Sequence, residues 1–205
     1  MEKMSQKNIK AYVGDINGGS LMLNDSLILA PYLLDEPDKD EWKRLVLEQN
    51  ILQRKSSQTA RRAAATVRKR LAPLGREFLT DLVTLPERAY IQLLMVSLLI
   101  QSPIMADFMS NVLAEARRVY KPALEPTAWQ DFIDDRCRAW PQLNDYSDET
   151  YKKIGKNIIR ALAEAGYIDS PRNKRIQPVY LEPEVKNWLD KLNRLDLIEV
   201  MESTF

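Results

Sequence analysis

Apolar residues recur three and four positions apart along most of the chain, which is the spacing of one face of an α-helix. Only six glycines occur in the chain, so few positions interrupt this pattern. The pattern predicts helices over about 20–34, 57–71, 78–101 with an interruption at Pro86, 103–120 and 147–165, with further helices starting after Asp38 and Pro126. We therefore expect a mainly α fold with little or no sheet.

Polar residues at several predicted helix starts are of the types that cap a helix N-terminus. They are Ser20, Asp38, Ser56 or Ser57, and Ser147. Gly166 follows the helix at 147–165 and can end it, because glycine readily adopts the left-handed conformation of a C-terminal cap. Beyond it, two short extended pieces, 167–168 and 176–181, enclose a basic turn, which is typical of a hairpin.

The elements predict three parts of the chain. Residues 1–76 would form an N-terminal helix-turn-helix unit, and residues 77–125 a central helical hub. Residues 126–205 would form a second helix-turn-helix unit, in which the basic hairpin would serve as a wing.

Composition excludes several classes of enzyme. The chain has no histidine and a single cysteine, Cys137. Histidine-based relays, cysteine–histidine nucleophile pairs and zinc sites of the usual spacings are therefore excluded. We expect no enzymatic activity, no cofactor and no metal. A lone cysteine cannot form an internal disulfide, so the cytoplasm is the expected compartment.

Hydropathy argues for a core helix instead of a membrane segment. The most apolar run, 89–100, is twelve residues long, whereas a helix needs ~18–20 apolar residues to cross a bilayer. A hydrophobic content of 45% with 29% charged residues is typical of a folded soluble protein. We therefore expect no membrane association.

Charge is unevenly distributed, although the formal net charge is only +1. Residues 49–76 contain eight bases and no acid, and residues 151–175 contain seven bases and two acids. A passive surface normally mixes both signs, so two basic regions of this density favour a polyanionic partner such as nucleic acid.

The first basic region coincides with the helix predicted at 57–71. At about 100° per residue, its apolar side chains form a narrow stripe and its polar side chains lie opposite, beside the small Ala65. Such a helix fits the major groove of DNA, where a recognition helix reads base edges with its N-terminal residues. The candidates for base contact are Ser57, Gln58, Thr59 and Arg62, and those for phosphate contact are Arg54, Lys55, Arg61, Arg68 and Lys69. The preceding segment 49–55 is longer than the ~3–4-residue turn of a standard helix-turn-helix, which indicates a variant.

The helix predicted at 147–165 has the same organisation. Its apolar residues share one face, its basic residues occupy the other, and the basic turn that follows would reach a phosphate backbone. The DNA-binding candidates are Lys152, Lys153, Lys156, Asn157, Arg160, Arg172, Lys174 and Arg175, of which Asn157 would contribute base preference.

Three stretches of the sequence carry a resemblance to a known family. They are the segment from Tyr12 to Gly18–Gly19 with the leucine-rich helix after it, QNILQRKSSQTARR at 49–62, and KKIGKNIIRALAEAGYID at 152–169. Over nearly its whole length the chain resembles BrxA, the small all-helical core protein of type 1 bacteriophage-exclusion (BREX) systems.

The resemblance implies two helix-turn-helix elements that bind double-stranded DNA through the two basic regions. It also implies other BREX components as partners: a methyltransferase, ATPases and a phosphatase-like protein. Some members of the family are labelled as membrane proteins, which the short apolar run at 89–100 does not support.

Other interpretations stay open on the sequence alone. The basic faces could be solvated surfaces without a partner. They could also dock acidic surfaces of other proteins, which would make the chain an interaction adaptor of a defence complex. A third alternative is a helical module that prefers RNA to duplex DNA.

Overall fold

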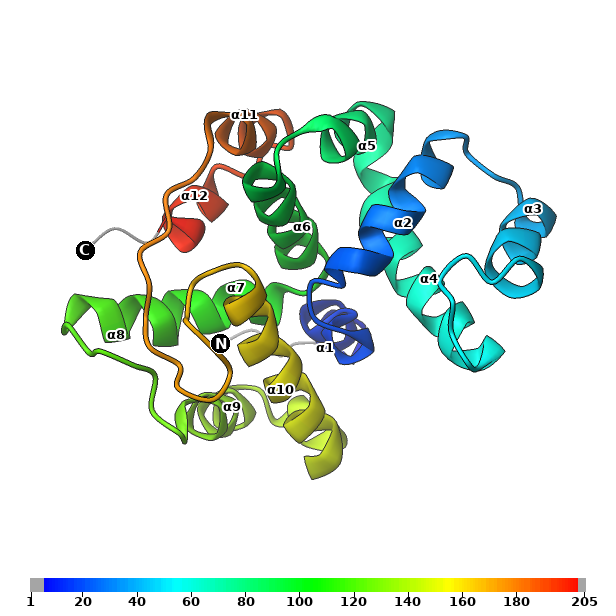
Figure 1. The fold of residues 1–205 in the computed structure, drawn as a ribbon. Coiled ribbons are helices and arrows are strands. Elements are labelled where there is room, and N and C mark those ends of the chain that lie inside the picture. The colour runs from blue at the N-terminus through cyan, green and yellow to red at the C-terminus, as the bar shows by residue number, and fades with distance from the viewer. Residues whose placement is uncertain (1–5, 203–205) are drawn as a thin grey trace.

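The computed structural model describes residues 6–202 and confirms a mainly α-helical fold (Figure 1). Within this range it contains no β-strand and only two isolated β-bridges. The α-helices are α1 (Gln6–Val13), α2 (Leu23–Leu34), α3 (Lys39–Lys43), α4 (Ser57–Leu71), α5 (Gly75–Thr84), α6 (Glu87–Gln101), α7 (Pro103–Phe108), α8 (Ala114–Arg118), α9 (Ala128–Ala139), α10 (Asp148–Glu164), α11 (Pro183–Lys191) and α12 (Asp196–Met201). Short 3₁₀ and π-helical pieces join them: η1 (Ile16–Gly18), η2 (Arg44–Glu48), η3 (Ala72–Leu74), η4 (Met109–Leu113) and η5 (Pro141–Asp145).

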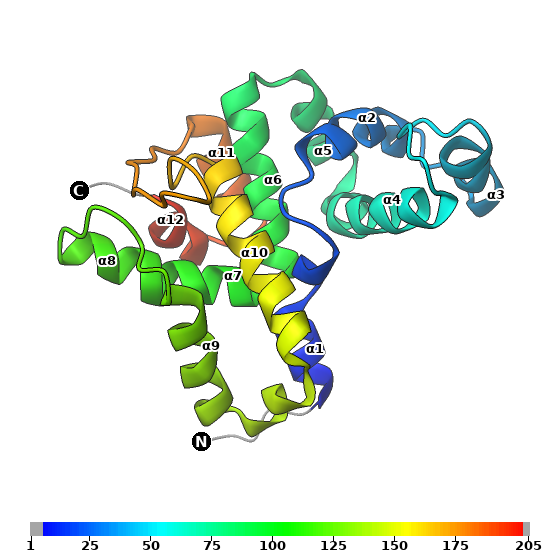
Figure 2. The ribbon, with the colours of Figure 1, turned by 60° about the horizontal axis from the view of Figure 1, so that its bottom comes forward.

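The helices surround α6, in which ten of fifteen residues are buried. Helices α2, α4 and α5 form one group beside α6, with α3 at the outer end of that group (Figures 1 and 2). Helices α7 to α10 lie on the other side, and α11 and α12 pack near the end of α6. The apolar run at 89–100 is thus the core helix that the sequence predicts.

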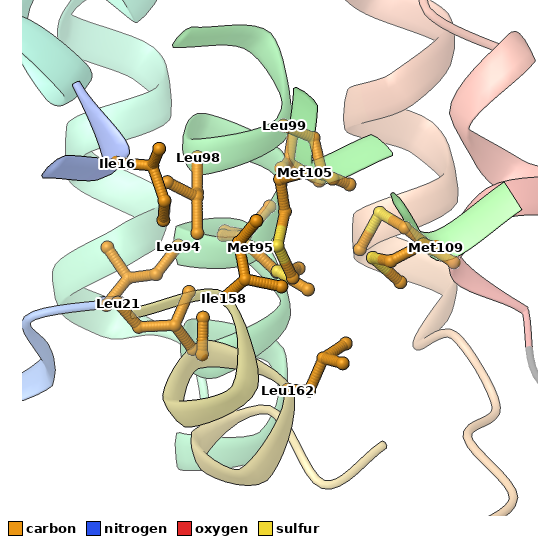
Figure 3. Close-up of a cluster of buried hydrophobic side chains, with 14 of the residues drawn as sticks. Ile16, Leu21, Leu94, Met95, Leu98, Leu99, Met105, Met109, Ile158 and Leu162 are labelled. Atoms are coloured by element: carbon orange, nitrogen blue, oxygen red, sulfur yellow. The ribbon is translucent and has the colours of Figure 1, made fainter. Parts of the chain in front are cut away.

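One continuous hydrophobic cluster crosses all three predicted parts of the chain. Figure 3 shows its centre, where Met95 and the leucines of α6 meet side chains from α7, from α10 and from the segment before α2. Ile16 and Ile158, which are far apart in the sequence, are both fully buried there. The segment before α2 therefore packs in the same core as α10.

Within residues 6–202, no single helix is both long and apolar enough to span a membrane. Helix α6 and the helix at Pro103–Arg118 meet the length and composition criteria only as a pair, and the chain bends by 107° between them.

The predicted helix caps are confirmed at two positions. Asp38 and Ser147 accept hydrogen bonds from first-turn amides of α3 and α10. Ser56 occupies the N-cap position of α4, but its hydroxyl caps no amide. The prediction for Ser20 is wrong: α2 begins further along the chain, and the Ser20 hydroxyl donates to a Glu164 carboxylate oxygen at 3.0 Å.

The basic turn after α10 packs against the segment that follows α8. The extended pieces on its two sides meet at an isolated bridge between Ile168 and Ile176. The Leu124 amide donates to the Lys174 carbonyl at 3.0 Å, and the Ile176 amide donates to the Pro122 carbonyl at 2.9 Å. The turn is therefore anchored along one side.

Candidate nucleic-acid interface

Helix α4 carries the first basic region, and its predicted apolar stripe is confirmed. Ala60, Ala64, Val67 and Leu71 are each at most 1% exposed. They face the interior, where α4 contacts α2, α6 and η2. The two alanines allow these neighbours to approach the helix closely.

The opposite side of α4 is open to solvent. Its exposed residues, together with one lysine just before the helix, are Lys55, Ser57, Gln58, Thr59, Arg61, Arg62, Ala65 and Lys69. Within residues 6–202, the four cations among them take no part in an ion pair. Their charges are therefore available to an external anion.

Two arginines predicted to bind phosphate have partners within the chain. Arg54 Nη2 donates to both carboxylate oxygens of Asp25, at 2.5 and 2.7 Å. Arg68 stacks over the Trp42 ring, 4.9 Å from its centroid, and donates to the Pro37 carbonyl at 2.9 Å. Arg54 therefore ties the turn before α4 to α2, and Arg68 ties α4 to α3 and the residues before α3, although the Arg54 side chain remains 41% exposed.

Two further arginines of this region also bind within the chain. Arg70 is 3% exposed and points inward toward Asp15, and Arg76 donates to the Leu34 carbonyl at 2.7 Å. Arg70, which the sequence does not mark as a DNA-binding candidate, is therefore a buried structural residue of this basic region. A desolvated guanidinium needs a carboxylate partner, and Asp15 lies 55 residues away in the sequence.

The segment 49–56 before α4 is an ordered turn. The Asn50 side chain accepts from the Arg54 amide and donates to the Arg54 carbonyl, both at 3.0 Å. Asn50 and Gln53 adopt positive φ angles of 48° and 51°, and the Leu52 side chain is buried. Helices α3 and α4 are thus connected by a fixed turn of more than the usual length.

Helix α10 carries the second basic region on an equally clear amphipathic framework. Tyr151, Ile154, Ile158 and Ala161 are buried, as predicted. At its C-terminus Gly166 adopts a φ of +79°. The Tyr167 amide then donates back to the Leu162 carbonyl at 2.9 Å, which closes the helix as a glycine-dependent C-cap.

The outer face of α10 presents Lys152, Lys153 and Lys156, which are exposed and without ion pairs among residues 6–202. Arg160 is also exposed, but its Nε donates to Glu164 Oε1 at 2.8 Å. Asn157 points elsewhere: its Nδ2 donates to the Ile16 carbonyl at 2.7 Å. The amide predicted to read bases is therefore occupied by a contact between α10 and η1, because 3.6-residue geometry places it at the edge of the buried face.

The cations of the basic turn form a separate group. Arg172 and Arg175 are exposed, whereas Lys174 is partly buried and has a φ of +55°. Figures 1 and 2 place this turn on the opposite side of α10 from α4. The basic turn thus lies apart from α4, on the far side of α10.

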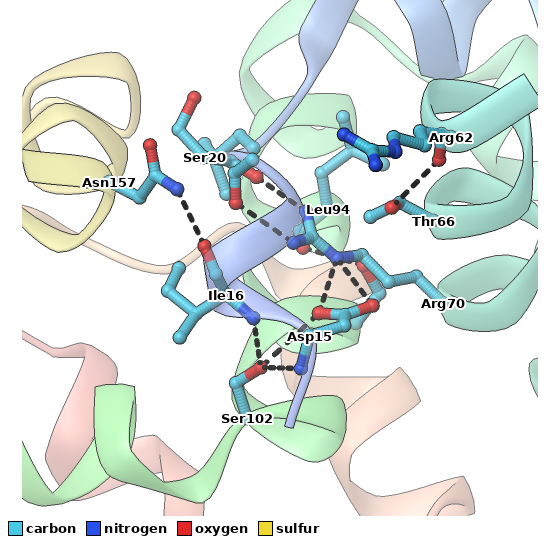
Figure 4. Close-up of polar contacts among 12 residues, drawn as sticks. Asp15, Ile16, Ser20, Arg62, Thr66, Arg70, Leu94, Ser102 and Asn157 are labelled. Carbon is cyan, nitrogen blue, oxygen red and sulfur yellow. Dashed lines mark hydrogen bonds and ion pairs between the residues drawn. The ribbon is translucent and has the colours of Figure 1, made fainter. Parts of the chain in front are cut away.

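The segment 15–21 lies between α4 and α10 and touches both (Figure 4). From the α4 side, Arg70 binds Asp15 and the Gly19 carbonyl, and from the α10 side Asn157 binds the Ile16 carbonyl. Gly18 is exposed on this segment. In the sequence Gly18 and Gly19 carry only part of the family resemblance, because their position between two basic helices is visible only in three dimensions.

Lys43 is an exposed cation near α4 that the sequence does not mark as a candidate. It lines a shallow apolar cleft of about 300 Å³ with Trp42, Val46, Leu47, Arg61 and Ala65. Lys43 belongs to a segment with a net negative charge, so counting charge along the chain hid it. The sequence does predict a helix on each side of the turn at 49–56. That arrangement could have indicated that Lys43 lies close to α4.

Gly155 determines how closely α9 approaches α10, and its replacement by alanine is expected to destabilise the protein. A Cβ at this position would lie 2.3 Å from Trp129 Cδ1. Alanine normally stabilises a helix by about 1 kcal/mol over glycine, but overpacking costs about 1–3 kcal/mol. We expect a net loss of roughly 1–2 kcal/mol in the free energy of unfolding, measured by urea titration. In a Trp129→Leu background the same substitution should be neutral or stabilising; an equal loss there would contradict the clash.

Comparison with known proteins identifies the family. The family model described as BrxA matches residues 10–193. The BREX protein BrxA of Escherichia coli is 42% identical over 196 residues, which cover 96% of this chain and 92% of that protein. The BREX protein BrxA of Paramagnetospirillum magneticum is 29% identical over 191 residues, 93% of this chain and 96% of that protein. A crystal structure of an uncharacterized protein from Magnetospirillum magneticum has a TM-score of 0.83 at 26% identity, covering 95% of this chain and 100% of that chain. On the strength of the family match and of these full-length similarities, the chain belongs to the BrxA family.

Proposed function

We propose that this chain is a non-enzymatic double-stranded DNA-binding protein of a BREX phage-defence system. Its family makes it a BREX protein, and DNA binding through α4 and α10 is our inference from the site. The observation that carries it is a set of exposed cations on or just before these two helices that form no ion pair among residues 6–202: Lys55, Arg61, Arg62, Lys69, Lys152, Lys153 and Lys156.

The two helices are suited to different contacts with a duplex. Helix α4 has no acid in its first turn and no side-chain cap, so its N-terminal amides and dipole can favour a phosphate beside the exposed cations. Its exposed Ser57, Gln58 and Thr59 would then face base edges. Helix α10 starts with Asp148 and Glu149, which disfavour phosphate there, so its lysines would contact the backbone from mid-helix.

Binding of this kind is dominated by counterion release, which gives a measurable test. If each of the seven exposed cations on or beside α4 and on α10 neutralises one phosphate, log Kd should rise with log salt with a slope of about 6. Fluorescence anisotropy with a labelled random duplex of about 24 bp, across a salt series, measures this slope. The absence of duplex binding at low salt would contradict the proposal, and preference for RNA in direct competition would redirect it to an RNA-binding module.

Other BREX components are the expected protein partners, since the relatives are BREX proteins. A methyltransferase, ATPases and a phosphatase-like protein of the system are the partners that we propose, with the cytoplasm as the compartment. No membrane partner is proposed.

One observation favours a second candidate function, docking of an acidic protein segment. The cleft at Trp42, Val46 and Leu47 has an apolar lining, with Lys43 and Arg61 also at the site. An acidic peptide with a bulky apolar side chain would match both properties. The test is co-purification of this chain with a BREX component after nuclease treatment. This alternative is favoured if the chain does not bind DNA, the co-purification survives nuclease, and the Leu47→Asp variant loses it.

A further inference from the structure

The buried polar contacts of segment 15–21 hold α4 from one side. Arg70 Nε donates to the two Asp15 carboxylate oxygens at 3.0 and 3.2 Å, and Nη2 donates to the Gly19 carbonyl at 3.0 Å. Its Nη1 donates to the Ser20 carbonyl. The Asp15 and Arg70 side chains are only 9% and 3% exposed. The guanidinium thus ties the whole segment to the C-terminal half of α4.

The same segment is held to α10 from the other side. Asn157 Nδ2 donates to the Ile16 carbonyl at 2.7 Å. Glu164 accepts from the Ser20 hydroxyl at 3.0 Å and from the Leu21 amide at 2.9 Å. These contacts join α10 to residues that Arg70 already joins to α4.

A third set of contacts ties the segment to the central helices. The buried Ser102 hydroxyl, between α6 and α7, accepts from the amides of Asp15 and Ile16 at 3.0 and 3.1 Å. Ser102 is fully buried. Because buried hydrogen-bonded networks rigidify a fold, we expect these contacts to limit the movement of α4 relative to α10.

Segment 15–21 contains two consecutive glycines, Gly18 and Gly19, of which Gly18 is exposed and packs closely against α4. A Cβ on Gly18 would lie 2.7 Å from Thr66 Oγ1 of α4. Arg62 lies one helical turn before Thr66 and extends from α4 toward the segment (Figure 4). Lys153 lies one turn before Asn157 on α10, since residues four apart are neighbours on a helix. The exposed Arg62 of α4 and the exposed Lys153 of α10 thus border a segment that is itself exposed at Gly18.

We infer that α4 and α10 bind one and the same duplex at once, with its phosphate backbone crossing over Gly18–Gly19, and that segment 15–21 sets the spacing between the two helices. This inference rests on the proposed function and adds the geometry of the complex. The acids nearby are neutralised within the protein, Asp15 by Arg70 and Glu164 by Arg160, so they do not repel the polyanion. Two contact sets on one rigid frame act as a bivalent binder, whose affinity exceeds that of either set alone.

Stoichiometry and residual affinity test the inference. Anisotropy and analytical ultracentrifugation would compare the parent chain with an α4 variant, Arg61→Ala with Arg62→Ala, and an α10 variant, Lys153→Ala with Lys156→Ala. If both helices share a single duplex of about 24 bp, one duplex should bind per chain. Each variant should then bind that duplex with a Kd at least ~30-fold higher than that of the parent chain. Two duplexes per chain, with each variant keeping one site of unchanged Kd, would overturn the inference but not the proposed function. No binding by the parent chain would contradict the proposed function itself.

Asn157→Ala tests the spacing role of the segment. Loosening α10 from η1 should weaken binding of the 24-bp duplex by roughly 5–10-fold. A duplex of about 8 bp serves as the short probe, and its weak binding through a single helix should stay unchanged. Asn111→Ala is the matched control, because it removes an amide that donates to the Asp107 carbonyl at 3.0 Å, within the α7–η4 region. Equal weakening with both duplex lengths, or with both variants, would overturn a spacing role for Asn157.

Discussion

Reversing Arg61 and Arg62 to glutamate is expected to abolish the duplex gel shift while the thermal unfolding midpoint stays nearly unchanged. Both side chains are exposed on α4 and take no part in an ion pair within residues 6–202. The buried stripe on the other side of α4 is untouched, and surface substitutions of this kind usually change stability by about 0.5 kcal/mol or less. At about 100 mM salt we expect Kd to rise at least ~100-fold, since two attractions become two repulsions.

The matched control changes net charge by the same amount elsewhere. Arg118→Glu with Arg138→Glu reverses two arginines of α8 and α9 that are 74% and 73% exposed and pair with Glu115 and Asp135. The control should keep most of the affinity. Equal losses in the two proteins would mean that overall charge, and not the α4 surface, governs binding. An unfolded Arg61/Arg62 variant would mean that these arginines are structural.

Replacing Arg70 with methionine is expected to lower the free energy of unfolding by about 3–5 kcal/mol, the usual effect of removing one partner from a buried ion pair. Asp15 would stay at 9% exposure without its cation, and the carbonyls of Gly19 and Ser20 would lose their donor. Burial lowers the pKa of Arg70, and the Asp15 charge opposes that shift. The Asp15 carboxylate therefore offsets the free energy that burying the charged guanidinium costs. Urea titration followed by circular dichroism measures the change.

Two further proteins make this result specific. Arg62→Met introduces the same side chain at an exposed position of α4 and should change stability by about 0.5 kcal/mol or less. Combining Arg70→Met with Asp15→Asn removes the unpaired charge and should recover part of the loss. A loss below about 1 kcal/mol in Arg70→Met would contradict a structural role for the pair.

The faces of α4 and α10 could be predicted from sequence because helical periodicity is a local property. Ala64 and Ile158 are fully buried, and Arg62 and Lys156 are exposed, as the 3.6-residue spacing requires. Capping by Asp38 and Ser147 was predictable for the same reason, since the cap and the amides that it satisfies lie within one turn.

Contacts between distant segments could not be predicted in this way. Arg54 binds a carboxylate 29 residues away, Arg70 one 55 residues away, and Asn157 a carbonyl 141 residues away. The capping prediction for Ser20 is wrong for the same reason, because the Ser20 hydroxyl donates to Glu164, which is distant in the sequence. Spacing along the chain carries no signal for such partners.

The sequence by itself determined a helical class, the inner and outer faces of two basic helices and the resemblance to a family, because these depend on neighbours within a few residues or on the residues themselves. Only the tertiary structure decided which cations are free and that α4 and α10 flank one rigid segment. The physical reason is that a charge is available to a partner only when folding leaves it solvated and unpaired, and pairing is settled by which distant carboxylates and carbonyls the packed core brings within about 3 Å.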